Sequence, residues 1–106
     1  MINYDLIPKS ILGEGKKLDV LGVNEYAFSF DNIKKIIEIL KEKEIPILGG
    51  DVYLLSDEKI YSTYDSWYMN KSDEKDFFLK SYEKTISYIS DYINDSEGQF
   101  VFSIVF

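Results

Sequence analysis

The sequence predicts an α+β fold in which a small antiparallel sheet, made of a hairpin and the carboxy-terminal strand, packs against two helices. Three observations predict this fold. Two segments carry apolar residues at helical spacing, apolar runs alternate with turn residues in the middle of the chain, and residues 99–106 are almost all aromatic or β-branched. At 106 residues the chain has the length of one ordinary domain, so we expect a single domain over residues 1–106.

The amino-terminal part of the chain shows no sustained periodicity. Residues 1–24 include Pro8 and three glycines, and we expect a lead-in with helical turns near residues 10–12 and 17–21. A short extended piece over residues 25–30 follows.

The first long helix is predicted after this extended piece. Apolar residues recur at the spacing of one helical face, lysines and glutamates take the other face, and Pro46 ends the pattern. Either Ser29 or Asp31 can accept hydrogen bonds from the free amides at the start of the helix. The apolar face consists of Ile33, Ile36, Ile37 and Leu40.

A hairpin is predicted in the middle of the chain. Apolar runs at residues 45–48 and 52–55 flank Gly49-Gly50-Asp51, and Ser56-Asp57-Glu58 then forms a turn into residues 59–64. A glycine pair in this position is typical of a bulge or bend that a side chain would block, although two glycines before an aspartate could also bring backbone amides close to an anion.

The last part of the chain predicts a long helix and a strand. The helix begins near Ser72, which can cap it, and ends near residues 94–98. Residues 99–106 have the composition of a central strand that is covered on one face and partly on the other. The apolar stripe of the helix consists of Phe78, Tyr82, Ile86, Ile89 and Ile93.

The composition removes most catalytic and metal-binding chemistry. The chain has no Cys and no His, and every basic residue is Lys, so disulfides, the usual zinc sites, the Ser-His and Cys-His pairs and the arginine fork are all excluded. A pair of carboxylates, for instance Asp51 with Asp65 or Glu25, could still perform acid-base work, but spacing alone does not show such a pair. We expect no enzymatic activity, no metal and no cofactor.

The charge of the chain indicates the class of its partners. Twelve basic residues against nineteen acids give a net charge of -7, which repels nucleic acid and anionic membrane surfaces. The first residues have no signal-peptide pattern and no apolar run is long enough to span a bilayer, so we expect a cytoplasmic protein. Most of the acidic excess lies in residues 51–106, where it either steers a basic partner or only keeps the surface soluble.

An aromatic cluster suggests a protein-binding surface. Tyr61, Tyr64, Trp67 and Tyr68 surround Asp65, and large aromatic side chains are enriched at the energetic centres of protein interfaces. The alternative is that these rings fill the edge of the core or pair across strands. Their spacing cannot place every ring on one face of a strand, so some of them should be exposed.

Three segments of the chain resemble a known family. They are Gly22-Val23-Asn24-Glu25, the stretch from Ile45 to Tyr53, and Tyr64-Asp65-Ser66-Trp67-Tyr68. In these segments, and in the order of its elements from about residue 20 to the end, the chain resembles the immunity protein 40 family of bacterial polymorphic toxin systems. The resemblance implies a small α+β protein encoded beside a toxin gene, which protects the producing cell by binding its cognate toxin. It carries over no catalytic residue.

Together these observations predict an immunity protein that binds a toxin domain, with no nucleic-acid or membrane partner. Two alternatives stay open: a small adaptor or homo-oligomeric interaction domain that pairs through an exposed strand edge, and a minimal hydrolase or ligand-binding protein that uses carboxylates. The sequence leaves the oligomeric state open. The partner-binding residues that we expect are Asp51, Tyr53, Asp57, Glu58, Tyr64, Asp65, Trp67 and Tyr68.

Overall fold

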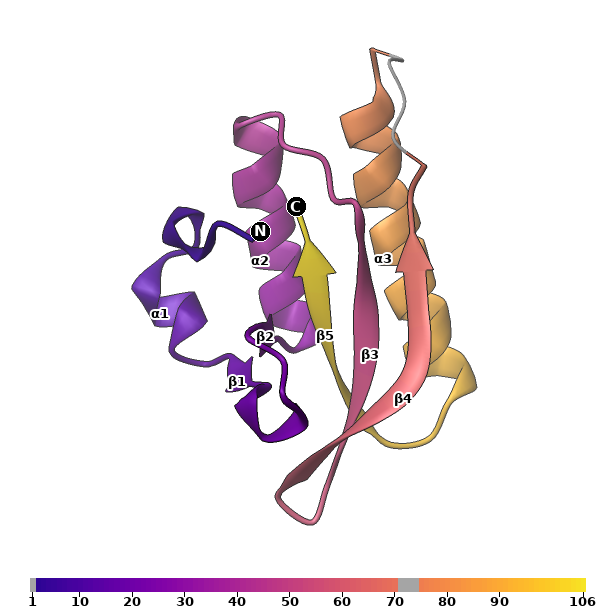
Figure 1. Cartoon of the computed structure of the whole chain (residues 1–106). Coiled ribbons are helices and arrows are strands. Elements are labelled where there is room, and N and C mark those ends of the chain that lie inside the picture. The colour runs from indigo at the N-terminus through magenta and orange to yellow at the C-terminus, as the bar shows by residue number, and fades with distance from the viewer. Residues whose placement is uncertain (1, 71–74) are drawn as a thin grey trace.

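A computed structural model describes residues 2–70 and 75–106, and it has the expected α+β architecture. Three antiparallel strands form a sheet in the order β4-β3-β5, and the long helices α2 and α3 lie behind it in Figure 1. Residues 2–28 form an arm beside β5, and this arm contains a second, two-stranded sheet. The elements are η1 (Tyr4–Leu6), α1 (Lys9–Leu12), β1 (Lys16–Lys17), η2 (Asp19–Leu21), β2 (Tyr26–Ala27), α2 (Phe30–Glu42), β3 (Gly49–Ser56), β4 (Lys59–Tyr68), α3 (Phe77–Asp95) and β5 (Gln99–Val105).

Helix α2 forms as its sequence predicts. The Ser29 hydroxyl accepts a hydrogen bond from the backbone N–H of Asn32 at 3.3 Å, which satisfies one of the free amides of the first turn. All four residues of the predicted apolar face are buried. The helix ends at Glu42, before Pro46, so both the start and the stop signals are confirmed.

Helix α3 begins later, and its buried face only partly coincides with the predicted apolar stripe: Tyr82 and Ile89 are buried, and Phe78 and Ile86 pack against the core. It starts at Phe77 after Asp76, whereas Ser72, the expected cap, lies outside the described residues. Ile93 is 39% exposed, because the helix turns a more polar face toward the sheet. The buried residues of this face are Phe77, Ser81, Tyr82, Thr85 and Ile89.

The hairpin is confirmed, with two changes in its extent. Asp57 and Glu58 both have positive φ values, 53° and 64°, as the tight turn that matches strand twist requires. Residues 45–48 form no strand and instead lead from α2 to β3. Strand β4 continues to Tyr68, because a bulge opposite Val52 absorbs extra residues.

The expectation that the last strand is central was wrong. Strand β3 is central, because it pairs with β4 on one side and with β5 on the other. The outer edge of β5 meets the arm at one isolated bridge, where Phe28 and Phe102 exchange two backbone hydrogen bonds of 2.8 Å. The aromatic character of β5 therefore reflects contact with the helices on one face and with the arm on the other.

The two faces of the sheet are covered differently. Val52, Trp67 and Phe102 belong to the main core with the buried residues of α2 and α3. On the opposite face, Leu18 and Ala27 of the arm pack in a smaller cluster with Tyr53 and Val101. We call this second side of the sheet the open face, because the arm covers only part of it and leaves Asp51 exposed.

The helices of the described part of the chain include none that is both long and apolar enough to cross a lipid bilayer.

Gly50 is required for the contact between β3 and β4. A Cβ atom at this position would overlap the Ser103 carbonyl oxygen and the Trp67 indole, so a side chain is blocked here as the glycine pair predicts. We therefore expect Gly50→Ala to lower the free energy of unfolding by about 1 to 3 kcal/mol, the usual cost of overpacking. Urea denaturation measures this change, and an unchanged midpoint would show that the sheet adapts to the methyl group.

Candidate partner-binding surface

The structure separates the aromatic residues of β4 onto two sides of the sheet. Trp67 is only 4% exposed, its indole N–H donates to the Thr85 hydroxyl at 3.1 Å, and its ring stacks on Tyr88 at 5.0 Å between centroids. Trp67 is thus a core residue, which corrects the expectation that it is a surface anchor. The reason is that α3 packs against this position and provides the Thr85 hydroxyl as an acceptor and the Tyr88 ring as a stacking partner.

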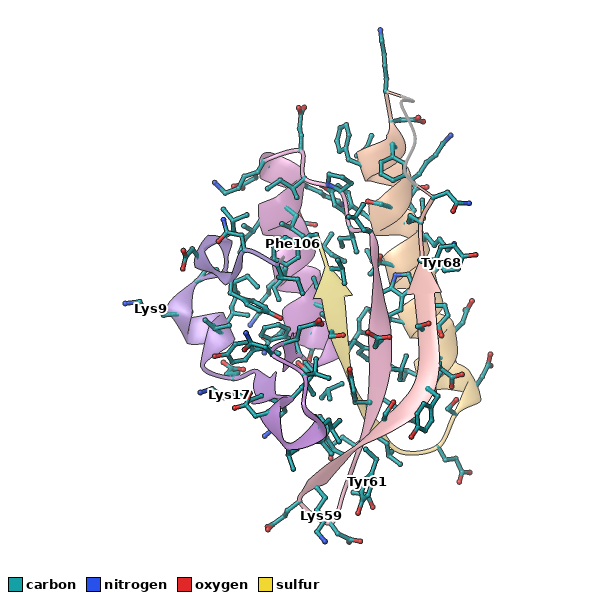
Figure 2. The ribbon with its side chains drawn as sticks, in the orientation of Figure 1. Lys9, Lys17, Lys59, Tyr61, Tyr68 and Phe106 are labelled. Atoms are coloured by element: carbon teal, nitrogen blue, oxygen red, sulfur yellow. The ribbon has the colours of Figure 1, made fainter. Side chains whose placement is uncertain are left out.

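Two other aromatic residues of the predicted set are exposed. Tyr64 is 93% exposed and lies in the bulge of β4, with φ at 64°. Tyr68 is 68% exposed at the end of the same strand, where Lys84 of α3 donates a 2.8 Å hydrogen bond to its carbonyl oxygen. Figure 2 shows Tyr68 at the end of β4 opposite to Tyr61 and Lys59. Both tyrosines are available to a partner in this structure.

Local hydrogen bonds hold the bulge that presents Tyr64. The Thr63 hydroxyl donates to the Val52 carbonyl oxygen at 2.8 Å and accepts from the Asp65 N–H at 3.1 Å. The Tyr64 N–H donates to the Ser62 hydroxyl at 3.1 Å. Since side chains replace the missing ladder bonds, the exposed position of Tyr64 is a built feature of the strand.

The predicted acidic residues lie in three different places. Asp57 and Glu58 lie at the exposed tip of the hairpin, where they line an open groove of about 980 Å³ between the hairpin and η2. Asp65 accepts a 2.7 Å hydrogen bond from the Tyr92 hydroxyl of α3, so it lies on the helix side of the sheet. Asp51 is exposed on the open face, in register with Ser66 and Ser103.

Glu25 of the arm is close enough to Asp51 for the two charges to interact. Burial raises the pKa of Glu25 above its ordinary value, and the negative charge of Asp51 raises it further. Its Oε1 atom is shielded from solvent and has no hydrogen-bond partner among the described residues. Of the two carboxylate pairs that the sequence suggests, the structure thus brings Glu25 close to Asp51 and keeps Asp65 apart.

Two tyrosines border this pair of carboxylates. Tyr53 is 6% exposed, and burial first and then the charge of Asp51 raise the pKa of its hydroxyl. The Ser103 hydroxyl beside it lowers that pKa, although no hydrogen bond of regular geometry joins the two groups. Tyr4 of η1 accepts a 2.9 Å hydrogen bond from the Tyr26 N–H, and burial also raises its pKa. Tyr53 is therefore packed between the sheet and the arm, and its ring is not accessible to a partner.

Glu25 is the residue of this surface that the sequence did not assign to partner binding. The sequence does name Glu25 as a possible carboxylate partner of Asp51, and its position just before β2, whose Ala27 is buried, places it at the margin of the arm's contact with the sheet. Within the described residues, no group of three or more acidic side chains could hold a metal ion.

The two aromatic positions of β4 predict opposite responses to truncation. Trp67→Ala removes a buried ring and its hydrogen bond, and we expect it to lower the free energy of unfolding by about 3 to 5 kcal/mol. Tyr64→Ala is the matched control, because an exposed ring contributes less than about 0.5 kcal/mol to folding. Urea denaturation of both variants measures the difference, and equal destabilisation would contradict the assignment of Trp67 to the core.

The shielded carboxylate predicts how stability depends on pH. Because the pKa of Glu25 is higher in the folded than in the unfolded chain, the folded state holds this proton more tightly, and ionisation of Glu25 costs stability as the pH rises through that interval. Glu25→Gln removes this loss. The stability of the variant relative to the unchanged protein should therefore rise as the pH increases above the ordinary pKa of a glutamate, about 4.3. A difference that stays constant or falls over this range in denaturation experiments would show that Glu25 ionises without penalty.

Comparison with known proteins identifies the family. The family model described as Immunity protein 40 matches residues 17–106, from β1 to the end of β5. None of the curated proteins or solved structures compared with the chain matches it. The family match includes Glu25, Asp51 and the whole of β4, whereas η1 and α1 precede it. Because it covers most of the chain, this protein belongs to the immunity protein 40 family.

Proposed function

We propose that this protein is an immunity protein, which neutralises a cognate bacterial toxin by binding it directly and in a fixed ratio. The family match over residues 17–106 is the observation that carries the proposal. The composition supports binding over catalysis, because without His, Cys or Arg the chain depends on few groups that could act on a substrate. The absence of Cys also agrees with action in the reducing cytoplasm of the producing cell.

The proposed toxin-binding surface consists of the exposed part of β4 and the open face. Tyr64 and Tyr68 provide large exposed aromatic area on β4, and Asp51 is exposed on β3 in register with Ser66 of β4. Such rings lose little conformational entropy on binding and combine apolar contact with one hydrogen-bonding atom. The remaining acids of the predicted set, Asp57, Glu58 and Asp65, then contribute to the encounter with a basic partner by long-range attraction.

Growth rescue tests the proposal. A sensitive host expresses the toxin-like protein encoded beside this gene, with and without the immunity protein, and the two proteins are purified together. We expect rescue and a complex of fixed ratio. A toxic neighbour that a well-folded protein neither binds nor neutralises would end the proposal.

The aromatic part of the surface is tested with the same toxin-like protein. If Tyr64 and Tyr68 are anchors, replacing each by Ala should weaken binding by at least about 5-fold. Leu79→Ala is the control, because Leu79 is a similarly exposed apolar residue, at 46%, on α3. Calorimetry or surface plasmon resonance measures the affinities. If the tyrosine variants bind as tightly as the control, toxin binding uses another surface.

A homo-oligomeric or adaptor function is the second candidate, and the free edge of β4 favours it. Among the described residues this strand pairs only with β3, so its other edge has backbone groups available to a further strand. The bulge at Tyr64 opposes such pairing, because it interrupts the regular ladder. A mass in solution that rises with concentration, together with failure of growth rescue, would favour this second function.

A further inference from the structure

The groove between the hairpin and η2, which we call the hairpin groove, has apolar side chains on both of its sides. Val20 and Leu21 of η2 line the arm side, and Leu55, Ile60 and Tyr61 line the hairpin side. Val20 is 78% exposed, Tyr61 46% and Leu21 38%. Single exposed apolar residues are ordinary, whereas a set that lines one groove indicates a binding surface. With a volume of about 980 Å³, the groove has room for several side chains of another chain.

The apolar residues of η2 are not used by the core of the protein. Leu18, the residue before η2, is fully buried, and its carbonyl oxygen accepts hydrogen bonds from the N–H groups of Leu21 and Val23 at 2.9 and 3.2 Å. Gly22 ends the turn in the left-handed region, with φ at 76°. Neither Val20 nor Leu21 packs in the main core or in the smaller cluster of the open face. Since Leu18 and the backbone hold the turn, folding gives no reason for two apolar residues on its surface.

The charged residues of the hairpin groove differ between its two sides. Lys16 and Lys17 of β1 lie on the arm side, whereas Asp57, Glu58 and Lys59 lie at the hairpin tip. Figure 2 shows Lys17 on the arm and Lys59 on the hairpin. Among the residues that the structure describes, none of these three lysines takes part in an ion pair or a cation–π contact. The arm side is therefore positive in a chain whose net charge is -7, and its ammonium groups have no counter-ion there.

We propose that the hairpin groove receives a segment of the toxin that packs an apolar side chain against Val20 and Leu21 and pairs an acidic residue with the lysines of β1. This inference rests on the proposed function. Burial of the apolar contact provides affinity, and the lysines select an acidic residue on the arm side. The two carboxylates of the hairpin tip favour a basic residue on the other side, so the charges also fix the direction of the bound segment.

A charge reversal tests the electrostatic part of this proposal, with the full chain and the toxin-like protein encoded beside its gene. Lys17→Glu makes the protein more acidic, and Lys35→Glu makes the same change at an exposed position of α2, outside the groove. The Lys35 variant therefore measures the effect of net charge alone, which for a basic toxin is unchanged or faster association. We expect Lys17→Glu to act in the opposite direction and to weaken the complex by at least about 5-fold, mostly through faster dissociation.

Truncation of Val20 tests the apolar part. Because Val20 is largely exposed, Val20→Ser should leave the urea midpoint of the free protein unchanged. It should weaken toxin binding by at least about 5-fold. Leu79→Ser is the matched control, since Leu79 is an exposed apolar residue of α3 that does not line the groove, and it should change the affinity by less than about 2-fold.

The proposal requires that both groove variants weaken the complex relative to their controls. If the toxin is bound and neutralised, and either Lys17→Glu or Val20→Ser binds within 2-fold of its control, the hairpin groove is overturned as the toxin's contact while the proposed function stands. A free protein whose mass in solution rises with concentration, and loses this rise with Val20→Ser, assigns the groove to a second copy of the chain and also overturns the proposal. Failure of the unchanged protein to bind the toxin removes both proposals.

Discussion

The packing of Trp67 against Gly50 and α3 is the contact on which the rest of the sheet depends. The indole ring lies over the backbone of Gly50, donates its N–H to Thr85 and stacks on Tyr88. One side chain thus connects β4, β3 and α3. Because the glycine leaves no room for sideways movement, this contact fixes which residues of β4 lie opposite β3, and therefore which of them point away from the helices.

The same contact determines which side chains of β4 point away from the helices. Side chains alternate along a strand, so with Trp67 on the helix side its neighbours Ser66 and Tyr68 are directed to the other side. The helices use one face of the sheet for the main core, and the arm covers only a part of the other. The exposed side chains of β4 include Tyr61, Tyr64 and Tyr68, and the open face adds the carboxylate of Asp51, so the surface offers aromatic and acidic groups for recognition.

Local signals in the sequence were sufficient for much of the fold. The spacing of Ile33 to Leu40 predicts α2 because a single helix face is enough to define it, and Ser56-Asp57-Glu58 predicts the turn because polar residues separate two β-rich runs there. For α3 the apolar spacing found only part of the buried face, Tyr82 and Ile89, and missed its polar residues. Ser81 and Thr85 are chosen for their hydrogen bonds to the Ile47 N–H and the Trp67 indole, and hydrophobicity gives no weight to such residues.

The candidate site was less accessible to sequence reasoning, for two physical reasons. Aromatic residues occupy both faces of β4, so the pattern shows that some rings are exposed without showing which ones. The electrostatic interaction between Glu25 and Asp51 requires the arm to lie alongside β5, as the long-range bridge between Phe28 and Phe102 shows that it does. Local propensity contains no information about a contact of that kind, although each acid was visible as a candidate by itself.

The surroundings of Glu25 include residues inside the family match and a residue that precedes it. Glu25, Asp51 and Ser103 all lie within residues 17–106, but the hydroxyl of Tyr4, whose pKa Glu25 also raises, comes from η1. A residue that precedes the match therefore lies within the electrostatic influence of a carboxylate inside it. Since the strength of such an interaction depends on how well water is excluded, a substitution in η1 that opens this region to water should weaken the repulsion between Glu25 and Asp51. Residues outside the family match can in this way act on the charge of residues inside it.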